Sequence, residues 1–341
     1  MIKAVRVHEH GGIDKVVIDD LPDPSPEPDG AVVEIKATSL NHLDIWVRNG
    51  IRGVPLPITL GSDGAGYVRE VGKNVTDLHP GDRVLVSPST SCGKCDACAA
   101  GTDTLCSEYK ILGEHCNGTD AELISVKRSN LFKLPDEVTF RDAASLALVF
   151  ITAYQMLVDK ARIQNGESVL VLGAGSGVGT TAIQIARLFG ARVIAVAGNN
   201  DKLNLARSLG ANDTINYNDG RISEEVRRLT GKEGVDIVFE HTGKLTWPES
   251  ILSARRGGRI VTCGATTGFD AMTDLRYVFA RQLTILGSTM GSKSLLQVLI
   301  DLLSRKRIKS VIYSVFHFTE VRKAQEMMEN RAHFGKIVLE F

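Results

Sequence analysis

Four cysteines are gathered on one short segment of the chain. They are Cys92, Cys95, Cys98 and Cys106, with the spacing Cys-x2-Cys-x2-Cys-x7-Cys. Four thiolates complete the tetrahedral shell that Zn2+ takes in structural sites, and a complete shell leaves no position for water or a substrate. The spacing therefore predicts one structural Zn2+ per chain, held in a lobe over residues 91–107. A thiol switch or a loop without metal is the alternative.

A glycine-rich turn has the composition of a phosphate-binding loop. The segment "GAGSGVG" (173–179) follows an apolar strand pattern and precedes a helix pattern. Glycines let the backbone approach a pyrophosphate closely, and a helix N-terminus offers free N–H groups. The loop is one residue longer than the strict G-x-G-x-x-G spacing. A tight turn without a ligand is the alternative. The expected pyrophosphate contacts are Gly175, Ser176, Gly177, Val178 and Gly179.

The next strand ends in a segment that bears on cofactor choice. In dinucleotide-binding folds an acidic residue at this strand end binds the ribose hydroxyls and indicates NAD. Here the strand ends "AVAGNNDK", with Asn199 at its tip and Lys202 close behind. This composition favours NADP(H) over NAD(H), although Asp201 stands nearby and is interpreted as a helix cap. We expect Asn199, Lys202 and Tyr217 to contact the adenosine end of the cofactor.

Two kinds of sequence surround these motifs and must position them. Over the first ~130 residues, short β-type runs such as 31–37 alternate with Gly- and Pro-rich turns. From residue 167 to 288, apolar strands alternate with helices, as in a doubly wound parallel sheet. We therefore predict an α/β protein with a mainly β domain over 1–150 and 290–341 and a dinucleotide-binding domain over 151–289. The helices expected in the second domain include 200–211 and 247–256, and a further helix over 294–308 is expected in the segment that returns to the first domain.

Composition excludes several classes of function. The chain of 341 residues carries forty basic and forty acidic side chains, so its formal net charge is zero. No block of like charge favours a nucleic-acid partner or a membrane surface. The N-terminus lacks a signal-peptide pattern, and no stretch approaches the ~18 consecutive apolar residues of a membrane span. The six cysteines are clustered rather than spread as a disulfide framework, which fits a cytoplasmic enzyme.

Several motifs in one order resemble the medium-chain dehydrogenase/reductase superfamily. They are "LGSDGAGYVREVG" (60–72), "PGDRV" (80–84), the cysteine cluster, the glycine turn and the closing "FGKIVL" (334–339). The resemblance implies a GroES-like, mainly β catalytic domain joined to a Rossmann domain. It also implies hydride transfer in the cleft between them, and a homodimer or homotetramer.

The same resemblance implies that the catalytic zinc has been lost. Zinc alcohol dehydrogenases bind that metal through Cys, His and a further Cys or acidic residue, where this chain has Asn41, Ser62 and Leu148. An amide, a hydroxyl and a hydrocarbon are poor or impossible zinc ligands. Leu43 also replaces the Ser or Thr that relays the alcohol proton. "NHLD" (41–44) instead resembles the zinc-independent quinone oxidoreductases, which reduce quinones or enones with NADPH.

The remaining site residues follow from the same resemblance. Asn41 and Asp44 would line the cleft, or else only brace a turn, and Asp63 would be a buried hydrogen-bonding carboxylate. Thr152 matches a threonine that contacts the nicotinamide. His241 either faces the cofactor or is a surface histidine with satisfied partners. The residues expected near the nicotinamide are Thr152, His241, Thr242, Gly264, Ala265 and Ser288.

We thus expect an NADP(H)-dependent oxidoreductase that transfers hydride to a small conjugated carbonyl, a quinone or an enone, with Asn41, Asp44, Asp63 and Thr152 in its catalytic site. No residue is identified as the general acid. One alternative is an alcohol dehydrogenase or aldehyde reductase with an unorthodox metal site. The ligands of that site would be drawn from His42, Asp44, Asp63, Glu114 and His115. Another is a non-catalytic NADPH-binding redox sensor.

Overall fold

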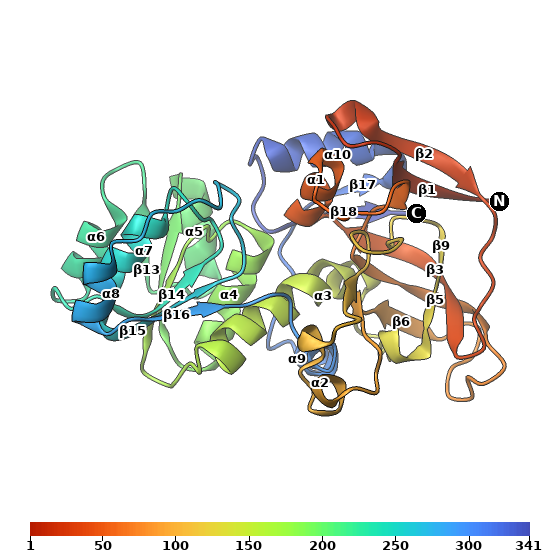
Figure 1. Ribbon diagram of the computed structural model, residues 1–341, viewed down its shortest axis with the longest axis horizontal. Coiled ribbons are helices and arrows are strands. Elements are labelled where there is room, and N and C mark those ends of the chain that lie inside the picture. Colours follow the sequence, from red (N-terminus) through yellow and green to blue (C-terminus); the bar gives the residue numbers. More distant parts are fainter. The chain divides into compact units, whose positions relative to one another are not determined.

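The computed structural model describes all 341 residues, which form two compact units. The first unit contains Met1–Leu148 and Ser292–Phe341, and the second contains Val149–Gly291. Figure 1 shows the first unit built mainly from strands, with the last part of the chain returning to it, and the second built from a sheet surrounded by helices. The α/β fold predicted from the sequence is therefore confirmed.

Three sheets form the first unit. The largest has seven strands in the order β10-β6-β5-β3-β18-β17, with β9 also paired to β3. Its members are β3 (Gly30–Ser39), β5 (Asp63–Val71), β6 (Arg83–Val86), β9 (Leu123–Lys127), β10 (Leu131–Lys133), β17 (Ile312–His317) and β18 (Lys336–Glu340). A second sheet has the order β2-β1-β4 and contains β1 (Ile2–Val7), β2 (Val16–Leu21) and β4 (Ile58–Thr59). The third sheet pairs β7 (Ser89–Thr90) with β8 (Lys110–Ile111).

The register of three strands brings their ends together. β3 and β5 pair antiparallel with Ser39 opposite Asp63, and β18 pairs antiparallel with β3 with Val338 opposite Ser39. Asp63 is the first residue of β5, and Lys336 is the first residue of β18. Glycine at position 66 allows the close pairing, because a Cβ there would lie 1.9 Å from the Glu34 carbonyl oxygen on β3. The end of β3 therefore meets the starts of β5 and β18.

Helices complete the first unit. α1 (His42–Asn49) follows β3 directly, and the short α2 (Asp96–Ala99) lies within the cysteine segment. α3 (Phe140–Tyr154) begins in the first unit and ends in the second, and α9 (Leu295–Ser304) and α10 (Val321–Glu329) belong to the returning segment. The continuous helix Phe140–Lys160 is long and apolar enough to cross a membrane, but 78% of its apolar window is buried inside the protein, as in a core helix.

The second unit is one parallel sheet of six strands with helices around it. The spatial order is β13-β12-β11-β14-β15-β16. The strands are β11 (Ser168–Val171), β12 (Arg192–Ala197), β13 (Asp213–Asn216), β14 (Val235–Glu240), β15 (Ala254–Thr262) and β16 (Thr284–Gly287). The helices are α4 (Gly177–Leu188), α5 (Asn200–Ser208), α6 (Ile222–Leu229), α7 (Trp247–Ser253) and α8 (Leu275–Arg281).

This strand order creates a binding edge. The chain starts at the central β11, moves outward to β13, and then returns to β14 on the other side of β11. In such sheets, ligands bind beyond the carboxyl ends of the strands at the point where the order reverses. Central strands covered on both faces are expected to be apolar throughout, and the Leu170, Ile194 and Val238 side chains are fully buried in the core.

Three helices are shorter than the sequence predicts. The helix expected over 247–256 ends at Ser253, because Ala254 already pairs with Val235 as part of β15. The helices expected over 200–211 and 294–308 end at Ser208 and Ser304.

Candidate active site

The four cysteines of the predicted zinc lobe converge. Their Sγ atoms all lie within 4.8 Å of one another, with 3.6 Å between Cys95 and Cys98 and 3.9 Å between Cys92 and Cys98. Tetrahedral Zn2+ with Zn–S bonds of about 2.3 Å requires Sγ–Sγ separations of roughly 3.8 Å. The donor set and its spacing therefore fit a structural zinc. This is the only such group of three or more His, Cys, Asp or Glu side chains in the chain.

Backbone N–H groups of the lobe stabilise the thiolate form of its cysteines. The Lys94 N–H donates to Cys92 Sγ at 3.5 Å, and the Glu108 N–H donates to Cys106 Sγ at 3.4 Å. Hydrogen bonds to the charged form of a thiol favour that form, which is the one that binds metal. With all four thiolates committed, the lobe is suited to hold a loop in place and not to bind a substrate.

The positions where zinc alcohol dehydrogenases bind catalytic zinc have other partners here. Ser62 Oγ donates to the Leu112 carbonyl oxygen at 2.7 Å. The Asn41 amide is shared between two neighbours: its Nδ2 donates to Asp63 at 2.8 Å, and its Oδ1 accepts from Lys336 at 2.6 Å. The Leu148 backbone N–H donates to Asp63 Oδ1 at 2.8 Å. The Ser62 and Asn41 side chains are thus engaged in hydrogen bonds within the protein.

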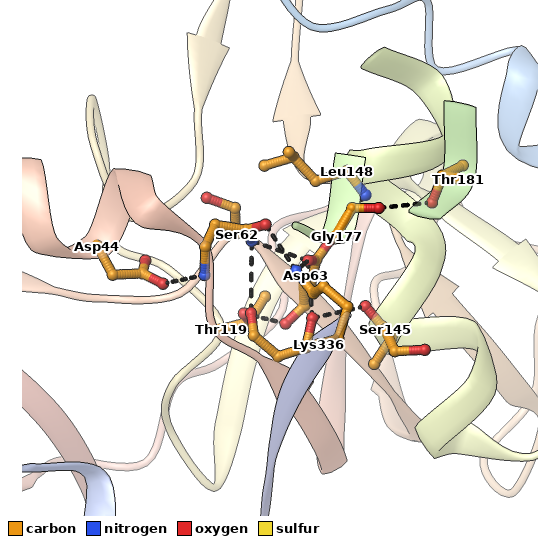
Figure 2. A network of polar contacts seen from close by, with 12 residues as sticks. Asp44, Ser62, Asp63, Thr119, Ser145, Leu148, Gly177, Thr181 and Lys336 are labelled. Carbon is orange, nitrogen blue, oxygen red and sulfur yellow. Dashed lines mark hydrogen bonds and ion pairs between the residues drawn. The ribbon is translucent and has the colours of Figure 1, made fainter. Parts of the chain in front are cut away.

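Asp63 is the centre of this network, which Figure 2 shows. Its carboxylate is fully buried and accepts from Ser39 Oγ at 2.9 Å as well as from the Asn41 and Leu148 donors. Lys336, itself only 3% exposed, places its Nζ 3.2 Å from Asp63 Oδ2. One negative and one positive charge thus compensate each other where β3, β5 and β18 meet.

Two further buried carboxyl groups belong to the same region. Asp44 Oδ2 accepts from the Asn41 N–H at 2.7 Å, so this pair braces the start of α1, as one interpretation of the sequence expects. Burial raises the pKa of Asp44 to about 6. Asp120 is also fully buried and neither carboxyl oxygen has a hydrogen-bond partner. Burial, followed by the nearby charge of Asp44, raises the pKa of Asp120 to about 8, so Asp120 is mainly protonated at neutral pH.

The residues of the unorthodox metal site have separate surroundings. His42 packs edge-on against Trp46, with ring centroids 5.1 Å apart. His115 Nδ1 accepts from the Ile111 N–H at 3.2 Å, and burial raises the pKa of Glu114. These side chains do not gather with Asp44 and Asp63 into a metal-binding group.

In the second unit, the glycine loop lies at the carboxyl end of β11. Ser176 is the N-cap of α4, and its Oγ accepts from the Gly179 N–H at 2.9 Å. Gly173 has φ +56°, and a Cβ on Gly179 would lie 2.4 Å from the Gly173 carbonyl oxygen. The loop is therefore tight enough to require glycine at these positions. Gly175, Gly177 and Val178 complete this strand-turn-helix.

The residues expected at the adenosine end follow the next two strands. Asn199 caps α5, because its side chain accepts from the Lys202 N–H at 2.9 Å, whereas Asp201 lies within the first turn and is not the cap. Tyr217 follows β13 and is half exposed. Its hydroxyl would lie 2.2 Å from a Cβ on Gly198, so Tyr217 covers the glycine at the end of β12.

The residues expected near the nicotinamide come after β14, β15 and β16, and Thr152 is buried on α3. His241 and Thr242 follow β14, Gly264 and Ala265 follow β15, and Ser288 follows β16. Two hydroxyls here, Thr242 Oγ1 and Ser288 Oγ, are buried without a hydrogen-bond partner. Buried polar atoms normally have partners, so these two indicate groups that a ligand would satisfy. The carboxyl edge of the sheet therefore fits a dinucleotide.

Three residues with central positions were not predicted to belong to a site. Lys336 stands inside the quoted "FGKIVL" motif, where a charge within an apolar run was an available signal. Glu240, at the end of an apolar strand, offered a similar signal. Asp120 gave none, because nothing local distinguishes a buried from an exposed aspartate.

Comparison with known proteins gives consistent matches. A family of zinc-binding dehydrogenases matches residues 177–305, and the alcohol dehydrogenase GroES-like domain matches residues 27–136. The crotonyl-CoA carboxylase/reductase of Cereibacter sphaeroides is 30% identical over 97% of this chain and 84% of that protein. The quinone oxidoreductase of Homo sapiens is 28% identical over 86% of this chain and 82% of that protein. A crystal structure of an NAD-dependent alcohol dehydrogenase is 45% identical, with TM-score 0.96, over 99% of both chains.

Replacing one zinc ligand tests the role of the lobe. Cys95→Ser should lower the bound zinc below one per chain and lower Tm by about 5 °C or more, because a structural metal contributes directly to folding. Dinucleotide binding at 25 °C should persist. The control is Cys116→Ser, a half-buried cysteine outside the cluster. Unchanged Tm together with lost turnover in Cys95→Ser would show that the lobe serves catalysis.

The buried carboxyl of Asp120 should make stability depend on pH. Its pKa is 3.8 when exposed and about 8 in the folded protein, so between these values the folded state holds a proton that the unfolded chain has released. The free energy of unfolding should therefore fall as pH rises toward 8, by at most about 1.4 kcal/mol per pH unit for this one proton.

Asp120→Asn, which mimics the protonated form, should remove this contribution. Urea unfolding from pH 5 to 9 measures it as the difference in slope between the wild type and the variant. Asp136→Asn, at an almost fully exposed aspartate, is the control and should keep the wild-type slope. Equal slopes for Asp120→Asn and the wild type would show that Asp120 is ionised in the folded protein.

Proposed function

The chain belongs to the medium-chain dehydrogenase/reductase superfamily, and we propose that it is an NADP(H)-dependent oxidoreductase that reduces a small conjugated carbonyl, a quinone or an enone, in the cytoplasm without a catalytic zinc. One observation carries this proposal. Asn41 and Ser62 use their side chains in hydrogen bonds to Asp63, Lys336 and Leu112, and the Leu148 N–H donates to Asp63.

An acceptor without metal assistance must stabilise the incoming charge by itself. In a conjugated carbonyl, the electron pair delivered to carbon is delocalised onto oxygen, so less electrophilic help is needed than for a simple aldehyde. Among the relatives, the crotonyl-CoA carboxylase/reductase and the quinone oxidoreductase are named for acceptors of this conjugated kind. Both names support the proposed substrate class.

The cofactor would be held by the carboxyl edge of the parallel sheet. When bound, the reduced nicotinamide supplies the hydride. The glycine loop and the N-terminus of α4 offer N–H groups for the pyrophosphate. Asn199 and Tyr217 provide uncharged groups at the adenosine end, which supports NADP(H) over NAD(H) because neither group would repel a 2′-phosphate. Thr242 and Ser288 offer free hydroxyls toward the nicotinamide end.

The 45% identity to an NAD-dependent alcohol dehydrogenase supports a second candidate function, the oxidation of alcohols or reduction of aldehydes with NAD(H). That function requires an electrophile other than the zinc lobe.

An acceptor panel with metal analysis separates the candidates. We expect one zinc per chain, NADPH oxidation with quinones and enones at least about tenfold faster than with simple aldehydes, and weaker activity with NADH. Two zincs per chain, with alcohol turnover abolished by a chelator, would establish the alcohol dehydrogenase. Tight NADPH binding without oxidation by any acceptor would establish the redox sensor.

We also propose that the protein is a homo-oligomer that pairs through β16. This strand is an edge of its sheet, so one side has unpaired backbone groups. Phe269 and Met272 are about nine-tenths exposed, and Phe279 on α8 is 70% exposed. These exposed apolar side chains all lie in the segment between β15 and the edge strand β16, and such exposed apolar residues are typical of a protein interface.

Charge on this surface should separate the subunits. The double variant Phe279→Lys/Ile285→Lys should elute as a monomer, because two added charges per subunit would be buried unpaired. Light scattering after gel filtration measures the mass. Tyr313→Lys, on the edge strand β17 of the other sheet, is the control and should remain oligomeric. A wild-type monomer would refute the proposal.

A further inference from the structure

Glu240 is a fully buried carboxylate at the last position of β14, next to the point where the strand order reverses. Its Oε1 accepts from the N–H groups of Thr242, at 2.5 Å, and Gly243, at 3.0 Å. Its Oε2 accepts from the hydroxyls of Thr246, at 2.8 Å, and Ser250, at 2.6 Å. Glu240 forms no ion pair, so these four donors alone stabilise its charge.

These contacts fix the loop over residues 241–246, here called the Glu240 loop. Both N–H groups at its start and the hydroxyl at its end bind the same carboxylate, and Ser250 extends the contact into α7. Such a turn has little freedom, because moving any part of it would leave a buried carboxylate or a buried N–H without a partner. Glu240 therefore determines the conformation of the whole loop.

The Glu240 loop in turn holds the loops that follow β11 and β15. The Thr242 carbonyl oxygen accepts from the N–H and the hydroxyl of Thr267, each at 2.8 Å, and the Lys244 N–H donates to the Gly268 carbonyl at 2.9 Å. On the other side, His241 Nε2 lies 2.8 Å from the Leu172 carbonyl oxygen. Burial lowers the pKa of His241, so the neutral ring with its proton on Nε2 makes this hydrogen bond.

One carboxylate thus orders three loops at the edge where the cofactor is expected. The same loop contains Thr242, whose buried hydroxyl lacks a partner. We propose that Glu240 is a positioning residue for the nicotinamide half of the dinucleotide, acting through His241 and Thr242. This inference rests on the proposed function, because it requires that the second unit binds NADP(H). The adenine, its ribose and the 2′-phosphate, expected at β12 and β13, lie outside the three loops that Glu240 orders, and only the 5′-phosphate of the adenosine half is expected at the loop after β11.

The two halves of the cofactor provide the test. Glu240→Ala removes the acceptor for four donors and should weaken NADPH binding at least about tenfold, while binding of 2′,5′-ADP, which lacks the nicotinamide and meets only the glycine loop through its 5′-phosphate, should weaken at least about threefold less. Glu240→Gln should bind NADPH within about threefold of the wild type, because its Oε1 can keep both N–H donors and the two hydroxyls can turn to accept from its amide. Fluorescence titration of NADPH and calorimetry with 2′,5′-ADP give both dissociation constants.

A matched control removes a carboxylate from the same region without touching the loop. Glu249 lies on α7 and accepts from the Ser223 N–H and from Arg221 on the side of α6. Glu249→Gln should leave the ratio of the NADPH and 2′,5′-ADP affinities unchanged. If Glu240→Ala weakens the binding of both ligands equally, or of neither, Glu240 has no positioning role toward the nicotinamide. If the wild type binds neither ligand, the proposed cofactor fails instead.

Discussion

Asp63 and Lys336 carry opposite charges out of water, and removing each ion from water costs several kcal/mol. Such a contact persists only when the remaining hydrogen-bonding capacity of both groups is used. Asp63 meets this condition with donors from Ser39, Asn41 and the Leu148 backbone. Because these partners come from different elements, the arrangement of the first unit around the site depends on all of them being in place. The Asn41 amide is central, since it binds both ions at once.

The second unit stabilises a buried carboxylate by a different device. Glu240 has no cation beside it, and hydrogen bonds from the loop that follows its own strand and from α7 hold the charge. A parallel sheet favours this solution, because the chain leaves each strand at the same edge and exposes free N–H groups there. The first unit thus compensates a buried carboxylate with a cation that is distant in sequence. The second unit does so with hydrogen-bond donors that are close in sequence.

Local patterns in the sequence were sufficient to predict much of this protein. The cysteine spacing, the glycine turn and the alternating apolar runs each lie within a few dozen residues, and the structure brings the corresponding residues to the zinc lobe and to the carboxyl edge of one sheet. The role of Lys336 was not predictable in this way, because 273 residues separate it from Asp63. The burial of Asp120 was not predicted for another reason. Its environment is set by the packing of Gly61 against it, and the residues next to Asp120 in the sequence do not indicate this contact.

The shared hydrogen bonds of Asn41 bear on how such a chain can evolve. Introducing a cysteine at position 41 would remove the amide that binds both Lys336 and Asp63, leaving the ammonium short of a partner before any metal could bind. A histidine at position 62 would first displace the hydroxyl bonded to Leu112. Each single substitution toward a metal ligand is therefore unfavourable alone, and a metal site would form only when all of them are present. A metal-binding variant is therefore separated from this sequence by several substitutions that are each unfavourable alone, which is a barrier of epistasis.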